Sequence, residues 1–292
     1  MISVMRHGFK HRGINFRVCY FKPESELNEL ANEHYKQNVC QCIRQWHYTE
    51  ANRNSIDMML AVNGIPVVAI ELKNQLTGQS VDDAMRQWEY NRNPKEYAFG
   101  FNKRVLAYFA CDLYNVYMTT QLNGAETVFL PFNQGSNGAG KDGGAGNPTT
   151  EDGKYVTSYF WENVLQKDKL LDILQKFISY ERSEKKKIMP DGSTKTTVSS
   201  KVIFPRYHQL DVVRKLVSHV RENGAGHNYL IQHSAGSGKS NSIAWTAYRM
   251  ASLHDENNNP IFDSVIIVTD AEFLTSSYRL RCPVSTTHSV VL

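Results

Sequence analysis

The stretch from residue 54 to residue 74 contains three side chains whose types and spacing could cut a phosphate ester. Glu71 and Lys73 lie two residues apart at the end of an apolar run, and Asp57 precedes them. Side chains alternate along a strand, so Glu71 and Lys73 would share one face. Two carboxylates can hold a Mg²⁺ ion beside the scissile phosphate, and a neighbouring lysine can orient the attacking water. The pattern predicts a metal-dependent nuclease, with Asp57 and Glu71 as metal ligands and Lys73 as the catalytic lysine.

Two strands joined at Asn63-Gly64 must position these residues, because both residues of this dipeptide tolerate a positive φ. A plain two-residue turn would pair Asp57 with Ile70 and place Asp57 on the face opposite to Glu71. The site therefore requires one extra residue, in the turn or in a β-bulge. We predict that extra residue, and its absence with Asp57 on the other face would exclude the site.

The acid–lysine pattern is loose, because a surface strand with a Glu71–Lys73 salt bridge would look the same. Three features favour the nuclease. The apolar run before Glu71 is typical of a buried strand, and Leu72 can offer a backbone carbonyl to a metal. Gln87 and Tyr90 lie one turn apart on an expected helix, where they could support Lys73 or touch the DNA backbone.

Residues 1–132 are predicted to form one α/β domain around this hairpin. The expected helix after the site is capped by Ser80 and has Asp82 and Asp83 in its first turn, which suits the positive end of a helix dipole. A second helix is expected to open at Pro23. The expected strands are residues 16–22, 40–48, the hairpin, 105–110, 115–119 and 127–132.

Residues 133–200 are predicted to join this domain to a second one. The Gly-rich stretch 133–154 cannot order itself alone, and we interpret it as a flexible loop, with a phosphate-contacting glycine loop as the alternative. Two helical segments are expected within 158–180, the second from Lys169 to Tyr180. The charged, turn-rich residues 181–200 indicate a linker or a hairpin.

A second candidate site is H-S-A-G-S-G-K-S at residues 233–240, between an apolar strand expected at 229–231 and a helix expected from Ser240 to about Ser252. Backbone N–H groups of such a loop cradle phosphates. His233 stands where the strict pattern has its first glycine. Lys239 would reach the β- and γ-phosphates of ATP, and Ser240 would bind Mg²⁺. The expected ATP-site residues are Gly236, Ser237, Gly238, Lys239 and Ser240.

Upstream of this loop, Tyr207 and Gln209 resemble an adenine-reading element, in which the ring stacks on the base and the amide bonds its edge. The alternative for Gln209 is an ordinary residue in the first turn of a helix expected over 210–221. A buried strand is expected at 265–269. This alternation of strand and helix over residues 201–292 predicts the beginning of a parallel-sheet domain.

The composition limits the class of protein. The chain has 292 residues, 41% of them hydrophobic, which is consistent with two or three domains that have real cores. The net charge of +4 means that any nucleic-acid surface must be a local basic patch. No run of about 18 apolar residues predicts a membrane helix, and the N-terminus lacks the apolar core of a secretory signal.

Five scattered cysteines indicate reduced thiols, so we expect a cytoplasmic protein. Cys40 and Cys42, with His47 nearby, could be metal ligands. Their spacing fits no common zinc pattern, and no second pair exists.

Four stretches, residues 15–25, 63–74, 204–209 and 230–245, resemble the restriction (R) subunit of type I restriction–modification enzymes. The similarity spans about residues 12–270. It implies a PD-(D/E)xK endonuclease domain followed by a RecA-like double-stranded DNA translocase. Such an enzyme uses Mg²⁺ and ATP, cuts unmethylated double-stranded DNA after translocation, and works with modification and specificity subunits.

On this resemblance Asp57, Glu71 and Lys73 are nuclease residues, Gln87 and Tyr90 are helpers, and Gly236, Gly238, Lys239 and Ser240 belong to the ATP site. The chain departs from the family by lacking a D-E-x-H box and a second motor lobe, and its sequence diverges after Asp270. We therefore expect an N-terminal part of such a subunit, with an incomplete motor domain at 201–292. Three alternatives remain: a second polypeptide that supplies the rest of the motor, an inactive remnant, or a module that binds ATP or DNA without cutting.

Overall fold

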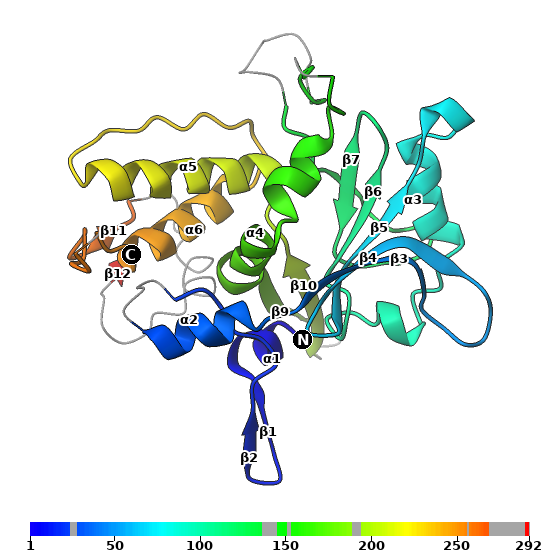
Figure 1. Ribbon diagram of the computed structural model, residues 1–292, viewed down its shortest axis with the longest axis horizontal. Coiled ribbons are helices and arrows are strands. Elements are labelled where there is room, and N and C mark those ends of the chain that lie inside the picture. Colours follow the sequence, from blue (N-terminus) through cyan, green and yellow to red (C-terminus); the bar gives the residue numbers. More distant parts are fainter. Residues whose placement is uncertain are drawn as a thin grey trace. The chain divides into compact units, whose positions relative to one another are not determined.

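The computed structural model describes residues 1–23, 28–135, 145–150, 153–188, 194–255, 257–268 and 290–291. The chain divides into two compact units (Figure 1). The first unit is Met1–Pro23 with Asn28–Phe204, and the second is Pro205–Leu292 with Glu24–Leu27. Residues 133–200, which we expected to join two domains, thus belong to the first unit.

A mixed six-stranded sheet forms the centre of the first unit, with the strand order β3-β4-β5-β6-β7-β8. Neighbouring strands are antiparallel except β5 and β6, which run parallel. The predicted α/β class is confirmed for this unit. The strands are β3 (Cys40–His47), β4 (Ser55–Val62), β5 (Ile65–Leu72), β6 (Ala107–Cys111), β7 (Val116–Thr119) and β8 (Leu130–Pro131).

The β4–β5 hairpin has the two-residue turn and also the extra residue that the candidate site requires. Asn63 and Gly64 adopt φ angles of 50° and 78°, as a tight hairpin turn demands. Further along β5 the register shifts at a β-bulge, where Val67 has no partner in the ladder. Beyond the bulge the ladder brings Asp57 opposite Glu71, so the predicted bulge is confirmed.

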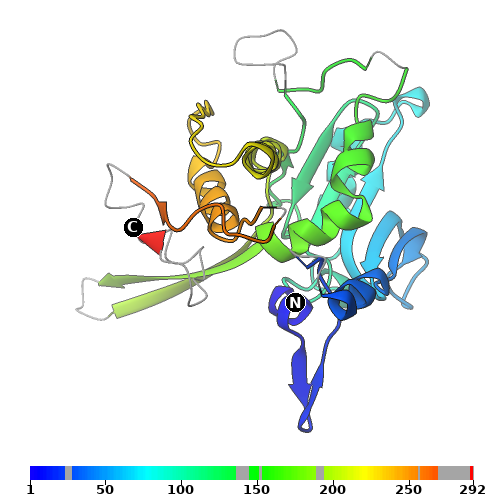
Figure 2. The same cartoon turned by 60° about the vertical axis from the view of Figure 1, so that its left-hand side comes forward.

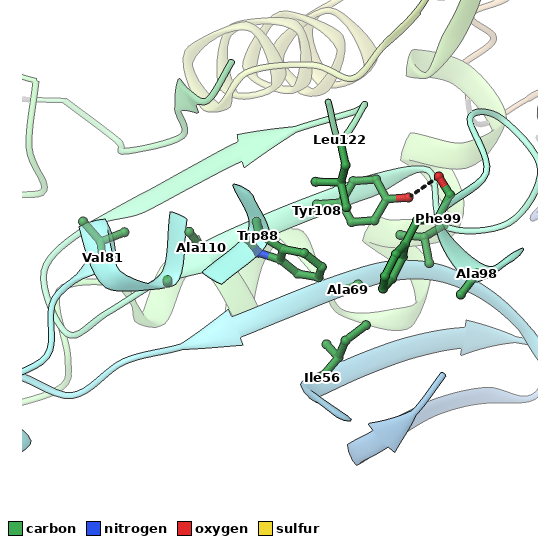
Figure 3. Close-up of a cluster of buried hydrophobic side chains, with 11 residues drawn as sticks. Ile56, Ala69, Val81, Trp88, Ala98, Phe99, Tyr108, Ala110 and Leu122 are labelled. Atoms are coloured by element: carbon green, nitrogen blue, oxygen red, sulfur yellow. Dashed lines mark hydrogen bonds between the residues drawn. The ribbon is translucent and has the colours of Figure 1, made fainter. Parts of the chain in front are cut away.

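Helix α3 (Val81–Tyr90) packs on β5, β6 and β7. Ser80 caps it, as predicted, and forms a capping box with Asp83, which the sequence did not predict. Trp88 is fully buried in the cluster of apolar side chains between this helix and the sheet (Figure 3), and its Nε1 donates a hydrogen bond to the Phe109 carbonyl at 2.9 Å. This packing fixes the rotation of α3, and therefore the direction in which its polar residues point.

Further elements complete the first unit. A hairpin of β1 and β2 projects from it in both ribbon views, and β9 and β10 form a long antiparallel ribbon (Figure 2). Of our two interpretations of residues 181–200, the hairpin is therefore correct. The elements are α1 (Ile2–His7), β1 (Phe9–His11), β2 (Ile14–Phe16), α2 (Glu29–Lys36), η1 (Gln75–Thr77), η2 (Tyr97–Phe99), η3 (Phe160–Val164), α4 (Lys167–Asp172), η4 (Ile173–Phe177), β9 (Ser179–Ile188) and β10 (Thr194–Ile203).

The strand expected at 16–22 is wrong, because β2 ends at Phe16 and the following residues form no strand. The backbone of Tyr20 is bonded to a side chain instead of a ladder: its N–H donates to Asn38 Oδ1 at 3.1 Å, and its carbonyl accepts from Asn38 Nδ2 at 2.6 Å. The helix expected from Pro23 appears as α2, capped by Asn28. Half of the Gly-rich stretch, residues 136–144 and 151–152, lies outside the described residues, and so does the choice between our two interpretations of it.

The second unit contains two helices that pack on each other, α5 (Tyr207–Asn223) and α6 (Lys239–Ala251). Its described strands are β11 (Val265–Ile266) and β12 (Val290–Val291), which pair in parallel. The strand expected at 229–231 is wrong: no strand forms there, and Leu230 is 95% exposed. An apolar run becomes a strand only where neighbouring strands pair its backbone, and none does so in the described part of this unit.

None of the helices in the described part of the chain combines the length and the apolar character that crossing a bilayer requires.

Candidate active site

Asp57 lies on β4, between β3 and β5, and a neighbour on each side holds its carboxylate. Its Oδ2 accepts a hydrogen bond from the Leu72 backbone N–H at 2.8 Å. Its Oδ1 accepts one from Nε2 of Gln45 on β3 at 3.2 Å. Since the bulge in β5 has corrected the register, these bonds hold the Asp57 carboxylate beside Glu71.

Glu71 is completely buried, at 0% exposure, near the end of β5. Its Oε1 accepts two hydrogen bonds from Arg92, from Nε at 2.9 Å and from Nη2 at 2.6 Å. Arg92 Nη2 also donates to the Ser55 carbonyl at 2.7 Å. The second oxygen, Oε2, is buried and has no hydrogen-bond partner among the described residues. The arginine therefore holds one oxygen of Glu71 and leaves the other available.

The electrostatics of this pair favour a cation. Burial raises the pKa of Glu71 to about 8, although Arg92 opposes that shift, and the nearby Asp57 carboxylate raises the pKa further. Two carboxylates that repel each other in a low dielectric gain from a positive charge placed between them. The unpartnered Oε2 shows that a single arginine does not fully satisfy them.

These residues fit a Mg²⁺ ion, which commonly binds one or two protein carboxylates and keeps several waters. Glu71 offers Oε2, and each Asp57 oxygen retains a lone pair beyond the hydrogen bond it accepts. Among the described residues no group of three or more His, Cys, Asp or Glu side chains is placed to hold a metal. A metal here would therefore rest on two carboxylates, with the Leu72 carbonyl as a further oxygen nearby.

Lys73 continues the pairing of β5 with β6, since its N–H donates to the Cys111 carbonyl at 2.9 Å. Its Nζ donates to Oε1 of Gln87 on α3 at 2.5 Å. Glu71 pairs with Arg92 and not with Lys73, so the surface Glu–Lys salt bridge that the pattern also allowed is absent from the described residues. Gln87 thus holds the Lys73 side chain, which alternation along β5 places on the same face as Glu71.

Tyr90 is not joined to this cluster. Its side chain is 70% exposed, and within the described residues its hydroxyl makes no hydrogen bond to Asp57, Glu71 or Lys73. The structure therefore brings together Asp57, Glu71, Lys73 and Gln87, and leaves Tyr90 at the surface of α3.

Sequence reasoning missed Arg92 and Gln45. Arg92 follows α3 in an irregular segment, and no spacing rule relates it to a strand residue so far before it in the chain. Only the general requirement that a buried carboxylate be paired could have prompted a search for it. Gln45 could have been found from the register of β3 on β4, which places it across from Asp57 between the pairs Arg44–Met58 and Trp46–Ile56.

Residues 19–134 match the family model described as type I restriction enzyme R protein N terminus (HSDR_N). This segment is similar to the HSDR_N family. It contains β3 to β8, α3 and every residue of the candidate nuclease site, so the resemblance found in the sequence is confirmed for this part of the chain. No curated protein matches the chain. The candidate ATP loop at 233–240 lies beyond the HSDR_N segment.

In that loop, the Lys239 side chain is hydrogen-bonded to backbone carbonyl groups of the loop itself. Its Nζ donates to the carbonyls of His233 at 3.2 Å and Ser234 at 3.0 Å. Gly236 and Gly238 adopt φ angles of 73° and 81°, which other residues rarely reach. The predicted residues Gly236, Ser237, Gly238, Lys239 and Ser240 thus form a turn that leads directly into α6.

The contacts of Gln209 differ from those of an adenine reader. Its Nε2 donates to the carbonyls of Ser237 at 3.1 Å and Gly238 at 3.0 Å, and its Oε1 accepts from the Arg206 N–H at 2.9 Å. Gln209 is only 2% exposed, and both ends of its amide are hydrogen-bonded within the protein. In this structure Gln209 ties the start of α5 to the loop, while Tyr207 opens the same helix.

Proposed function

We propose that this chain belongs to the restriction subunit of a type I restriction–modification system, and that its first unit is a Mg²⁺-dependent endonuclease for unmethylated double-stranded DNA. The observation that carries this proposal is the placement of Asp57 opposite Glu71, with Lys73 on the same strand face, inside an HSDR_N segment. The β-bulge brings Asp57 opposite Glu71, and Gln87 holds the Nζ of Lys73.

The residues have distinct tasks in this proposal. Asp57 and Oε2 of Glu71 would hold the cation, which would supply Lewis-acid chemistry at the phosphate. The Lys73 ammonium, held by Gln87, places a positive charge where the phosphate gains negative charge during cleavage. Arg92 opposes the rise in the pKa of Glu71 that burial causes, and its two hydrogen bonds orient the carboxylate.

The wider function follows from the family. We propose double-stranded DNA and the modification and specificity subunits as partners, and coupling of cleavage to ATP-driven translocation. The support for ATP is the 233–240 loop, whose positive-φ glycines lead into α6 as a phosphate-binding loop does. A RecA-like motor, of which the second unit would form a part, is included in this proposal.

The test is nicking of supercoiled plasmid DNA by the purified chain. We expect cleavage that requires Mg²⁺, stops with EDTA, and falls at least about a hundredfold in Asp57→Asn, because the cation supplies several kcal/mol of transition-state stabilisation. In an assay without ATP, Lys239→Ala is the matched control, because its site lies outside the HSDR_N segment, and it should nick at the rate of the unmodified chain. Cleavage that survives both EDTA and Asp57→Asn would contradict the proposal.

One observation favours a second candidate, a module that binds DNA or ATP without cutting: Glu71 is already ion-paired, and in the described part of the chain only two carboxylates meet at the site. The same nicking assay separates the two functions. A non-cutting module would retain DNA in a filter-binding assay while releasing no nicked product at any Mg²⁺ concentration.

We also expect the chain to bind a fluorescent ATP analogue, with an affinity about ten- to a hundredfold lower in Lys239→Ala, since one charge-assisted contact contributes about 1.5–3 kcal/mol. Titration of fluorescence anisotropy measures this. The control is Lys215→Ala, an exposed lysine on α5 that pairs with Asp211 one turn away. Equal affinity in all three proteins would remove the loop as the nucleotide site.

A further inference from the structure

Gln45 has an unusual backbone conformation for its place in the fold. Its φ of 48° lies in the left-handed region although it is inside β3. The other non-glycine residues with positive φ in the described part of the chain are in turns or bends, namely Arg12, Asn63, Asn102 and Asn258. A glutamine inside a strand gains nothing locally from this conformation, so something in its surroundings must maintain it.

The conformation directs the Gln45 side chain to Asp57. Oε1 of Gln45 accepts a hydrogen bond from Ser55 Oγ at 2.7 Å, and Nε2 donates to Asp57 Oδ1 at 3.2 Å. A carboxylate oxygen only accepts hydrogen bonds, so the amide must present its NH₂ end to Asp57. Ser55, which lies on β4 together with Asp57, holds the other end of the Gln45 amide. The two contacts together define one orientation of Gln45.

Asp57 is therefore held on both sides. Gln45 holds Oδ1 from β3, and the Leu72 N–H holds Oδ2 from β5. Arg92 holds the facing carboxylate, Glu71, through one oxygen only. Without Gln45, the Asp57 carboxylate would keep one anchor and could turn about its terminal bond, away from the free Oε2 of Glu71.

We propose that Gln45 is a positioning residue, which holds Asp57 in the orientation that binds the cation, and that its strained backbone is retained for this purpose. The inference rests on the proposed nuclease function and adds a residue to it. Gln45 acts through Asp57 and touches neither the phosphate nor the cation. If the strained backbone of Gln45 serves to orient Asp57, a variant that removes both the strain and the amide should be at least as stable as the unmodified protein. The same variant should bind Mg²⁺ more weakly.

That variant is Gln45→Gly, which removes the amide and also relieves the strain, because glycine adopts this φ freely. We expect a melting temperature equal to or above that of the unmodified protein. The Mg²⁺ concentration for half-maximal nicking, and the Mg²⁺ dissociation constant measured by calorimetry without DNA, should rise about 10- to 100-fold. The KM for DNA should stay unchanged, because Gln45 does not contact the substrate.

Two further variants make the test specific. Gln45→Asn tolerates a positive φ and keeps an amide, but its side chain is too short to span the same distance, so it should show the same weakening of Mg²⁺ binding. Arg12→Gly relieves a positive φ of 46° in the exposed turn between β1 and β2, and should leave Mg²⁺ binding and nicking unchanged.

Unchanged Mg²⁺ affinity in Gln45→Gly and Gln45→Asn would overturn the inference, whether or not their melting temperatures fall. Failure of the proposed function looks different: the unmodified chain would not nick DNA at all, and the calorimetric comparison with Gln45→Gly would still decide the role of Gln45. No Mg²⁺ binding by the unmodified chain would overturn both.

Discussion

Replacement of Lys73 by methionine is expected to lower the kcat of Mg²⁺-dependent DNA cleavage by about 10²–10³-fold, the usual effect of removing one preorganised charge from a developing anion. Methionine keeps the length of the side chain and removes its charge. The Mg²⁺ concentration for half-maximal rate should change little, because Lys73 is not a metal ligand. Single-turnover cleavage at saturating DNA, over a series of Mg²⁺ concentrations, measures both quantities.

The hydrogen bond to Gln87 makes the prediction sharper. The 2.5 Å contact with Gln87 Oε1 is the constraint on Lys73 Nζ that the structure shows. Gln87→Leu should therefore reduce kcat as well, by about tenfold, since it leaves the charge in place but frees its position. Lys10→Met, on the projecting β1–β2 hairpin, is the control for loss of a surface charge. A Lys73→Met protein that cuts as fast as Lys10→Met would exclude Lys73 from catalysis.

The second large effect is on stability. Arg92→Met should lower the free energy of unfolding by about 3–5 kcal/mol, because it leaves Glu71 buried without its partner. Burial already raises the pKa of Glu71, which shows how poorly solvated this carboxyl is. Urea denaturation followed by circular dichroism measures the change. The exposed pair Arg182–Glu184 supplies the control, and Arg182→Met should cost less than about 1 kcal/mol.

A double variant isolates the pair from other roles of Arg92. Glu71→Gln removes the buried charge with little change of shape, so Glu71→Gln with Arg92→Met should be more stable than the sum of the two single effects implies. The difference is the interaction free energy of the pair. If the two single effects simply add, the arginine stabilises the fold through its bond to the Ser55 carbonyl and not through Glu71.

The candidate site could be predicted as far as local rules reach. Alternation along a strand places Glu71 and Lys73 together, and the geometry of an Asn-Gly turn requires the bulge that the structure contains at Val67. Helical phase places Gln87 toward the sheet. Gln45 would have required the register of β3 on β4, which the sequence did not provide. Arg92 could not be derived, because it reaches the site from an irregular segment after α3, and no spacing rule relates it to Glu71.

The same limit explains the errors in the fold. An apolar run at 229–231 has the composition of a strand, but a strand needs a paired neighbour, and no local rule reports whether one exists. The run at 16–22 fails for a different reason, since the side chain of Asn38 satisfies the backbone of Tyr20 in place of a ladder. The composition of these two segments favours a strand, but contacts with residues far away in the sequence determine whether a strand forms.

Because of the bulge at Val67, the alignment of Glu71 with Asp57 depends on whether the number of residues between them and the turn is odd or even. Between the Asn63-Gly64 turn and Glu71, any change in chain length by one residue would exchange the two faces of β5 and separate Glu71 from Asp57, while a change by two residues would restore their alignment. Chains with this site should therefore differ in β5 by even steps, or should move an odd residue into the turn. The site thus restricts insertions and deletions in this segment to even numbers of residues, whatever their total length.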